Sequence, residues 1–420
     1  MIAVRRLFLT VAVMAGVVSA AVPASADMHA DQPGKPGHAP VVLFPAFHFT
    51  KLLVAVHDQR IDPRCPRSGT FQDWYLDNVR NTFSQVCRDE LLTLRYDQNP
   101  RLPMARRFSD QPGVSVRLLD YGSVRSAPFY QPLYAALEKA GWMADKDIRV
   151  AGYDSRLTPD QEGFLPRTVR LIEDAYRAND DRRVLLVGHS NGPLYAQYLL
   201  THTSRAWRAK YIAGFVPIAG NFPGQGLAYS VAFTGLNTID FSYPTTMANA
   251  VSSARMYLSA PSTYMSMADP AVFGRSEIVL RDVSTGRAYT PADYRQLFTD
   301  AHLLVARQIA EYYIGFVKFR DPIHFPDVNV WAERGSGLST VIGAQLANLT
   351  AGQLTSPNTV FYTRDGDGNQ EDTTNTAILV WRAMRGFQFS LTRNAGVDHF
   401  SLPSNPNVLT RLVTHAEHAT

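Results

Sequence analysis

The sequence predicts an α/β fold in which a mainly parallel sheet is covered by helices on both faces. Short apolar runs with strand character alternate with helical stretches, an order typical of parallel strands joined by crossover helices. The chain has 420 residues and is 45% hydrophobic, as ordinary globular proteins are. This length suits a single core that carries large insertions.

The predicted elements follow one another along the chain. Residues 40–45 (PVVLFP) form a short apolar run closed by proline, which is the pattern of a buried strand. Residues 182–187 (RRVLLV) give another strand, and residues 193–202 (PLYAQYLLTH) after it are helical. The further strand-like runs are residues 113–119, 147–152, 210–220, 358–363 and 386–392, and the further helical stretches are residues 159–177 and 406–418.

The alternation of strands and helices fails between residues 222 and 354, where Ser, Thr, Tyr, Met and Pro are frequent. We interpret residues 222–354 as a cap inserted above the carboxyl edge of the sheet, where ligands bind in open α/β folds. The core then comprises residues 40–221 and 355–420. The alternative is that the last third of the segment continues the core.

The N-terminal residues predict an export signal. Arg5 and Arg6 precede an apolar stretch, and residues 24–26 (ASA) supply the small side chains that cleavage requires. We expect residues 1–26 to be a signal peptide cleaved near Ala26, residues 27–39 to be a disordered lead-in, and the mature protein to be secreted. A membrane anchor is the alternative, but the apolar stretch is short for a span.

Charge and cysteine content argue against two kinds of site. The formal net charge is +4 without a dense run of Lys or Arg, which argues against nucleic-acid binding. The two cysteines, Cys65 and Cys87, predict a disulfide in an exported protein. A zinc site would need several histidines beside them, and His57 is the only one in that region. We therefore expect no metal and no cofactor.

A G-x-S-x-G motif, residues 188–192 (GHSNG), lies between the predicted strand 182–187 and the predicted helix 193–202. In that context the motif indicates a nucleophile elbow, in which a tight turn projects the serine above the edge of the sheet. The helix N-terminus behind the serine favours developing negative charge. An ordinary glycine-rich turn is the alternative, but the flanking elements favour Ser190 as the nucleophile of an α/β-hydrolase fold.

A serine nucleophile needs a base and an orienting carboxylate, which follow in the order Ser, Asp, His in this fold. His399 comes after the strand-like run 386–392 and before the final helix, so it is the predicted base. The acid should follow the run 358–363, where Asp365, Asp367 and Asp372 are all candidates. A calcium loop is the alternative for this D-G-D-G segment, but it lacks the remaining EF-hand ligand spacing.

These residues resemble the lecithin:cholesterol acyltransferase family, which includes the lysosomal phospholipase and diacylglycerol-acylating enzymes of plants and yeast. Residues 40–47 (PVVLFPAF) are similar to its P-V-[IV]-L-V-P-G-x strand, residues 152–156 (GYDSR) to its P-Y-D-W-R, and residues 207–215 (WRAKYIAGF) to its W-K-x-x-[FY]-I-x-G-F. The other matching segments are residues 52–58, 65–87 and 112–122. The resemblance implies an α/β-hydrolase fold with a cap insertion and a disulfide-closed lid loop at residues 65–87.

The resemblance also implies roles in the reaction for single residues. The family's acid is the second aspartate of a D-G-D-x-T-V loop, which corresponds to Asp367 here. Because Asn369 and Gln370 stand in place of Thr and Val, Asp372 remains the reserve candidate. The family's oxyanion donors correspond to the main-chain N–H groups of Phe47 and Asn191.

The lid loop carries apolar side chains between its two cysteines. These side chains, which include Phe71, Trp74 and Tyr75, predict a mobile lid that contacts lipid and uncovers the acyl site. Trp74 also corresponds to the lipid-contacting tryptophan of the family's lid loop. The alternative is that these side chains pack against the cap.

The sequence therefore predicts a secreted serine lipid acyl-hydrolase or O-acyltransferase. Ser190 would take a fatty-acyl group from a phospholipid or other lipid ester and pass it to water or a lipid alcohol. The partners would be that lipid ester and a membrane or lipoprotein-like lipid surface contacted peripherally. The alternatives are a general secreted carboxylesterase or lipase without transferase activity, and a catalytically inactive lipid-binding relative.

Overall fold

The computed structural model describes residues 37–73, 83–236 and 246–418. The predicted signal peptide and most of the predicted lead-in, residues 27–39, lie outside these ranges. His38 and Ala39 lie inside them and are buried, and the Ala39 N–H donates to the Ala416 carbonyl at 2.8 Å. The boundary predicted at residue 39 is therefore wrong, because this stretch is held against the C-terminal helix.

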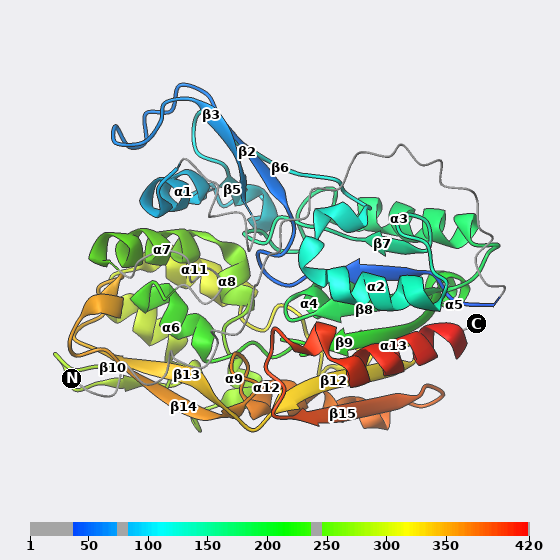
Figure 1. Cartoon of the computed structure of the whole chain (residues 1–420). Coiled ribbons are helices and arrows are strands. Elements are labelled where there is room, and N and C mark those ends of the chain that lie inside the picture. The colour runs from blue at the N-terminus through cyan, green and yellow to red at the C-terminus, as the bar shows by residue number, and fades with distance from the viewer. Residues whose placement is uncertain (1–36, 74–82, 237–245, 419–420) are drawn as a thin grey trace, which may run out of the picture. The chain divides into compact units, whose positions relative to one another are not determined.

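Six parallel strands form the central sheet in the order β15–β12–β9–β8–β1–β7 (Figure 1). Their bounds are β1 Val41–Phe44, β7 Ile148–Val150, β8 Val184–His189, β9 Ile212–Ile218, β12 Val330–Ser336 and β15 Phe389–Ala395. Val42 and Phe44 face one core cluster, whereas Val41 and Leu43 face the other. Because both faces are buried, β1 and β9 are apolar along their length. The predicted mainly parallel sheet is confirmed.

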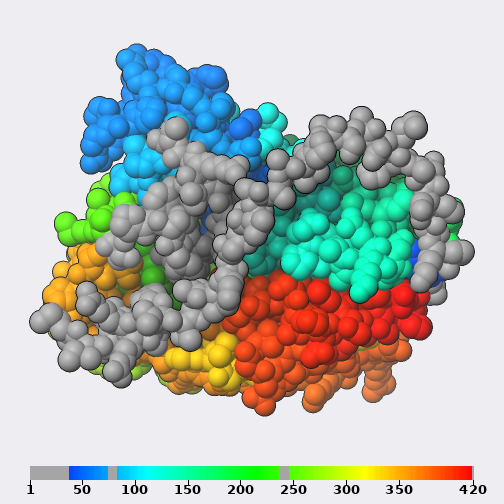
Figure 2. All heavy atoms as spheres, in the orientation of Figure 1, coloured from blue at the N-terminus to red at the C-terminus, as the bar shows by residue number. Residues whose placement is uncertain are grey.

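Helices cover both faces of this sheet. On the face of Val41 lie α2 (Gln131–Ala140) and α13 (Pro406–His418), and Figure 2 shows these two helices side by side. On the face of Val42 lie α3 (Phe164–Ala178), α4 (Gly192–Thr201) and α5 (Arg205–Tyr211). Both predicted layers of helices are present.

A second sheet, in the order β11–β10–β13–β14, lies beside α6 and α7 (Figure 1). Only β10 and β13 are parallel in it. Its strands are β10 Leu280–Asp282, β11 Ala288–Tyr289, β13 Leu338–Leu346 and β14 Val360–Gly366. The helices of this part are α6 Leu227–Thr234, α7 Met247–Ser259, α8 Pro261–Met265, α9 Pro270–Phe273, α10 Tyr294–Asp300 and α11 Leu304–Tyr313.

The predicted limits of the cap, residues 222–354, are wrong at two strands. β12 lies inside these limits but belongs to the central sheet, and β14 lies outside them but pairs antiparallel with β13. β12 carries a charged residue, Glu333, which hides its strand character in the sequence. Arg411 donates to the buried Glu333 carboxylate at 2.6 and 2.7 Å, which makes the burial of that charge tolerable.

A three-stranded antiparallel sheet, β3–β2–β6, stands apart from the central one. Its strands are β2 Leu52–Val56, β3 Gly69–Asp73 and β6 Val114–Leu118, so the strand-like run 113–119 does not belong to the parallel sheet. The remaining α-helices and strands of the described ranges are α1 Gln85–Leu92, β4 Arg95–Tyr96, β5 Phe108–Ser109 and α12 Asp372–Thr376.

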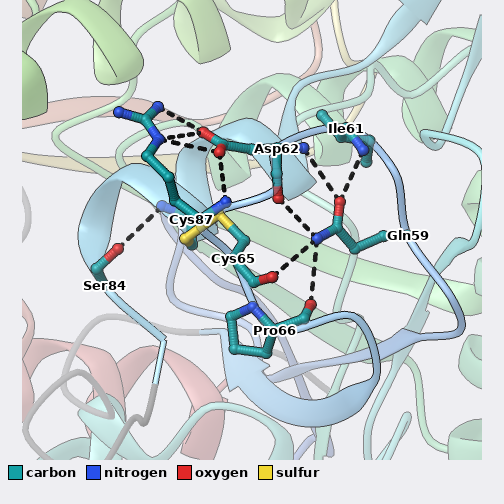
Figure 3. Close-up of a disulfide and its surroundings, with 8 residues drawn as sticks. Gln59, Ile61, Asp62, Cys65, Pro66, Ser84 and Cys87 are labelled. Atoms are coloured by element: carbon teal, nitrogen blue, oxygen red, sulfur yellow. Dashed lines mark hydrogen bonds and ion pairs between the residues drawn. A yellow bond between two sulfur atoms is a disulfide. The ribbon is translucent and has the colours of Figure 1, made fainter.

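The predicted disulfide joins Cys65 to Cys87, with an S–S distance of 2.00 Å (Figure 3). Cys65 lies in a loop gathered around Gln59, whose side-chain amide donates to the carbonyl groups of Asp62, Cys65 and Pro66. Cys87 lies in the first turn of α1. The bond therefore ties this loop to α1.

None of the helices in the described ranges combines the length and apolar character that crossing a bilayer requires.

We predict that the double variant Cys65→Ser/Cys87→Ser unfolds more easily. The bond closes a separation of 22 residues in the chain. Restricting the unfolded chain over such a loop is worth about 3 kcal/mol. Urea denaturation followed by circular dichroism should show a free energy of unfolding lower by about that amount. An unchanged denaturation midpoint would contradict this prediction.

Candidate active site

The turn between β8 and α4 holds Ser190 at a positive φ of 59°. Glycine is required on both sides of it. A Cβ at Gly192 would lie 2.0 Å from the Phe44 carbonyl oxygen, and one at Gly188 would lie 2.8 Å from the Pro193 nitrogen. The G-x-S-x-G spacing is thus explained by the close approach of α4 to β8 and to the end of β1.

Two main-chain hydrogen bonds hold Ser190 in this sparsely populated backbone conformation. Its N–H donates to the Ile218 carbonyl at 3.0 Å, and its carbonyl accepts from the Asn221 N–H at 3.0 Å. Both partners lie at or just beyond the end of β9. The neighbouring strand therefore supports the backbone strain that the elbow carries.

Asp367 lies beside His399 in the structure, and the two residues are hydrogen-bonded. The His399 Nδ1–H donates to Asp367 Oδ2 at 3.0 Å, and the His399 main-chain N–H donates to the Asp367 carbonyl at 2.8 Å. The other carboxylate oxygen, Oδ1, accepts from the N–H groups of Asn369 and Gln370 at 3.0 and 2.7 Å. Both side chains are buried.

The other two candidate acids do not reach the histidine. Asp365 is exposed on β14, and Asp372 is paired with Arg334 at the start of α12. Asp367 reaches it because Gly335, at the end of β12, leaves room. A Cβ on Gly335 would lie 2.7 Å from the Asp367 Cβ and 2.3 Å from the Val397 carbonyl.

Asp367 is held as a carboxylate. Burial alone would raise its pKa, but the neighbouring His399 and the N–H groups of Gln370 and Asn369 together lower that pKa below its ordinary value. Asp367 is therefore ionised at neutral pH. A carboxylate in this position fixes the imidazole with its hydrogen on Nδ1, which leaves Nε2 free to accept a proton.

The two predicted oxyanion donors lie at the pocket that contains Ser190 and His399. Phe47 follows β1, and Asn191 precedes the first turn of α4. Within the described ranges, no residue accepts a hydrogen bond from the main-chain N–H of either. Both N–H groups are thus available for negative charge that develops on a bound carbonyl oxygen.

This pocket has a volume of about 70 Å³. The apolar groups around it come mainly from the first turns of α6 together with Tyr257 of α7. Polar groups come from α8 and the loop before α6. The residues around it are Ala46, Phe47, Phe49, Ser190, Asn191, Gln225, Leu227, Ala228, Val231, Tyr257, Thr263, Ser266, Asn369, His399 and Phe400.

The predicted lid residues are only partly described. Trp74 and Tyr75 lie outside the described residues. Phe71 is only 6% exposed, and its ring packs on Phe83 with the ring centroids 4.8 Å apart. Phe71 belongs to a buried cluster that includes Phe83 and Cys87, and its contact with lipid stays a prediction.

A buried chain of hydrogen bonds connects His399 to the loop that carries Phe47. The His399 carbonyl can only accept, so His189 Nε2 donates to it at 3.0 Å. Burial, together with the neighbouring His399, lowers the pKa of His189 well below its usual range, so the imidazole is neutral and Nδ1 accepts from the Tyr130 hydroxyl at 3.0 Å. The Tyr130 oxygen accepts from the Ala46 N–H at 2.8 Å. These three hydrogen bonds fix the base loop relative to a predicted oxyanion donor.

No motif in the sequence indicates this chain of hydrogen bonds. His189 is the variable residue of the G-x-S-x-G motif, and its side chain points away from the serine. Tyr130 lies in the aromatic segment before α2, and no motif marks it. Only the fold brings these two side chains together.

A second buried polar group lies behind the acid loop. Glu371 accepts from the Gly226 N–H at 2.9 Å, and the neighbouring Glu277 pairs with Arg364 at 3.1 Å. Burial raises the pKa of Glu371 to about 8, and the negative charge of Glu277 adds to this effect. Glu371 is therefore protonated at neutral pH in the folded protein.

The site defines the class of protein. A serine on a tight strand–helix turn and an Asp–His pair supplied by later loops, all at the carboxyl edge of a parallel sheet, are characteristic of α/β-hydrolases. A chain in the crystal structure of the Tle4–Tli4 complex has a similar fold, with a TM-score of 0.52 and 12% identity, and the match covers 91% of this chain and 99% of that one. The predicted fold class is confirmed.

Residues 85–306 match the lecithin:cholesterol acyltransferase family, and this chain belongs to that family. It is 26% identical to lecithin-cholesterol acyltransferase-like 1 of Oryza sativa subsp. japonica, with 86% of this chain and 82% of that protein covered. It is 25% identical to the lysosomal phospholipase A and acyltransferase of Bos taurus, with 81% and 78% covered. It is 24% identical to the phosphatidylcholine-sterol acyltransferase of Gallus gallus, with 71% of each covered. The predicted family and its serine-hydrolase enzyme class are confirmed.

We predict that Tyr130→Phe lowers both stability and activity. The change leaves His189 Nδ1 and the Ala46 N–H unpaired in the core, which costs about 1–3 kcal/mol of unfolding free energy. It also releases the His399 loop, and a displacement near 1 Å can lower kcat by about a hundredfold. Turnover of a p-nitrophenyl ester and urea denaturation measure the two effects.

The matched control for that variant is Tyr134→Phe on α2. The Tyr134 hydroxyl donates to the Ala127 carbonyl at 3.0 Å, away from the pocket. This control should lose stability while keeping kcat. Equal losses of kcat in the two variants would show that the Tyr130 hydroxyl has no positional role.

We predict that Glu371 makes the protein less stable in alkaline solution. The pKa of the group is about 8 in the folded protein against 4.5 for the ordinary side chain. The folded state therefore binds the extra proton between these two values, and the free energy of unfolding falls as pH rises through this range. Glu371→Gln should reduce this fall in the free energy of unfolding, which thermal unfolding at about pH 5 and about pH 9 measures. The control is Glu138→Gln, at an exposed position of α2, which should not reduce it. An unchanged slope in Glu371→Gln would contradict the assignment.

Proposed function

We propose that this chain is an exported serine lipid acyl-hydrolase and O-acyltransferase that forms a fatty-acyl-enzyme on Ser190. The observation that carries the proposal is the buried hydrogen bond between Asp367 and His399 at the pocket that contains Ser190. The substrate class follows from the relatives, one of which is named a lysosomal phospholipase A and acyltransferase.

The proposed reaction has two steps. Ser190 Oγ attacks the acyl carbonyl and gives its proton to His399 Nε2, while Asp367 stabilises the resulting imidazolium. The N–H groups of Phe47 and Asn191 stabilise the oxyanion. The imidazolium then protonates the leaving alcohol. Water or a lipid alcohol, deprotonated by His399, releases the acyl group and restores Ser190.

The pocket suits an apolar acyl group. Leu227, Ala228 and Val231 occur at helical spacing on α6, and Tyr257 stands beside them. No Asp, Glu, Lys or Arg occurs among the described residues around the pocket. Burial of methylene groups against such a wall contributes about 0.8 kcal/mol each, which favours fatty-acyl esters over polar ones.

Export is the second part of the proposal. The disulfide between Cys65 and Cys87 supports it, because disulfides persist in oxidising compartments. The residues predicted as a signal peptide support it as well.

A second candidate function is hydrolysis of small carboxylic esters without acyl transfer. The pocket volume of about 70 Å³ favours it, because a long acyl chain is several times larger. The two candidates differ in whether the long acyl chain of a phospholipid is accepted, which the following experiment measures.

That experiment supplies the purified mature protein with phosphatidylcholine vesicles that contain a labelled acyl chain and a long-chain alcohol. We expect label in free fatty acid or in a new ester, and neither product with Ser190→Ala. Labelling of Ser190 by a fluorophosphonate without either product would overturn the lipid substrate. Activity confined to short acyl esters would favour the second candidate.

We predict that Asp367→Asn lowers kcat by about 10⁴-fold, because an asparagine favours the wrong tautomer of the histidine. The control is Asp372→Asn, whose carboxylate pairs with Arg334 instead. This control should keep kcat within about threefold of the wild-type value, since a partly exposed ion pair contributes little. Turnover of a p-nitrophenyl ester, normalised to fluorophosphonate-reactive protein, measures both variants. A larger loss in Asp372→Asn than in Asp367→Asn would reverse the assignment of the acid.

A further inference from the structure

Phe47, whose main-chain N–H is a predicted oxyanion donor, lies in a tight turn between β1 and β2. The Phe49 N–H donates to the Ala46 carbonyl at 3.2 Å, so Phe47 and His48 are the two central residues of this turn. His48 has a positive φ of 65°. The third position of a type II turn requires such a φ and usually holds glycine or asparagine. The chain therefore carries a histidine where the backbone alone would favour glycine.

The side chain of His48 is anchored to a carboxylate. His48 Nε2 lies 2.7 Å from Asp73 Oδ2, and the His48 side chain is only 17% exposed. Because a carboxylate can only accept, Nε2 carries the hydrogen and donates it. A positive φ costs a residue with a Cβ about 1–2 kcal/mol, and such strain persists only where the surrounding contacts hold it. The hydrogen bond to Asp73 is a contact of this kind, and glycine could not make it.

Asp73 is the last residue of β3 and is only 2% exposed. Its other carboxylate oxygen, Oδ1, accepts from Arg88 Nη2 at 2.7 Å. Burial alone would raise the pKa of Asp73, but His48 and Arg88 together hold that pKa well below its ordinary value. Asp73 is therefore a carboxylate at neutral pH, with one donor on each oxygen.

The anchor itself is fixed by regular structure. Asp73 lies opposite Leu52 in the antiparallel pairing of β3 with β2. Arg88 lies in α1 directly after Cys87, and the disulfide to Cys65 holds this turn of the helix. The carboxylate that binds His48 thus has a defined position relative to β2, which follows the turn in the chain.

The turn is held on both sides of Phe47. On one side, the Ala46 N–H donates to the Tyr130 oxygen at 2.8 Å, and on the other His48 donates to Asp73. The Phe47 N–H lies between these two attachments. An oxyanion donor acts only when its N–H lies about 2.7–3.1 Å from the position of the oxyanion. A rotation of the turn would therefore remove this N–H from reach.

We propose that His48 is a positioning residue, whose hydrogen bond to Asp73 holds the turn so that the Phe47 N–H points at the carbonyl oxygen of the bound ester. This inference rests on the proposed function. The N–H forms its strongest hydrogen bond when that oxygen becomes negative in the tetrahedral intermediate. Loss of the positioning therefore lowers kcat and leaves KM almost unchanged.

The test combines two measurements on the mature protein. Turnover of p-nitrophenyl butyrate gives kcat and KM. Inhibition by propyl trifluoromethyl ketone reports on the oxyanion donors without turnover. Ser190 Oγ adds to the carbonyl carbon of this ketone, the serine proton passes to His399 Nε2, and the carbonyl oxygen becomes an oxyanion. A misplaced donor therefore raises the inhibition constant of the ketone.

The decisive variant is His48→Gly, which relieves the backbone strain and removes the anchored side chain. We expect kcat to fall between about tenfold and a hundredfold, with KM within about twofold of the wild-type value. The inhibition constant of the ketone should rise by the same factor as kcat falls. Asp73→Asn keeps the shape of the anchor but weakens it as an acceptor, so it should act in the same direction.

The double variant His48→Gly/Asp73→Asn should be no slower than the slower single variant. Both changes remove the same hydrogen bond, so their effects on kcat are not additive.

The matched control is His302→Gly. His302 is also a histidine with a positive φ, at 57°, but it is exposed and is not one of the residues around the pocket. This control should leave kcat, KM and the inhibition constant unchanged.

Three outcomes would count against the proposal in distinguishable ways. Wild-type kcat and ketone inhibition in His48→Gly would overturn the positioning role while the proposed function stands. A raised KM with unchanged kcat would also overturn it, because the residue would then act in binding alone. A wild-type protein that neither hydrolyses the butyrate ester nor binds the ketone would overturn the proposed function, and the positioning role with it.

Discussion

The close approach of α4 to the end of β1 is the constraint on which the site depends. Only glycine fits at position 192, because a Cβ there would lie 2.0 Å from the Phe44 carbonyl oxygen. This contact forces the tight turn at Ser190 and its positive φ. It also places the N-terminus of α4 beside the loop that follows β1. Two main-chain N–H groups, those of Phe47 and Asn191, therefore lie at one pocket.

The same principle of close backbone approach positions the rest of the site. Gly335, the next-to-last residue of β12, has no side chain and lets Asp367 pack against the central sheet, although β14, which precedes Asp367, belongs to another sheet. The hydrogen bonds of His189 then join the His399 loop to Tyr130. Loops from distant parts of the chain are thus held together by buried hydrogen bonds, whose net strength depends on exclusion of water.

Much of this arrangement was predictable from the sequence, because local patterns determine it. The strands β1 and β9 are uniformly apolar, and the elbow motif stands between a strand and a helix. β12 was not predicted because a charged residue such as Glu333 is expected at the surface. Its burial in the sheet depends on the hydrogen bond from Arg411, which the sequence does not reveal. Tyr130 was missed for a related reason. Its role arises from contacts between segments far apart in sequence, which no local pattern encodes.

The most direct test of the account is mass spectrometry of the protein quenched during turnover of a fatty-acyl ester. The account predicts an acyl adduct on the peptide that contains Ser190, absent in Ser190→Ala and accumulating when no alcohol acceptor is present. An adduct on another residue, or turnover that persists in Ser190→Ala, would contradict the central claim that the elbow between β8 and α4 supplies the nucleophile.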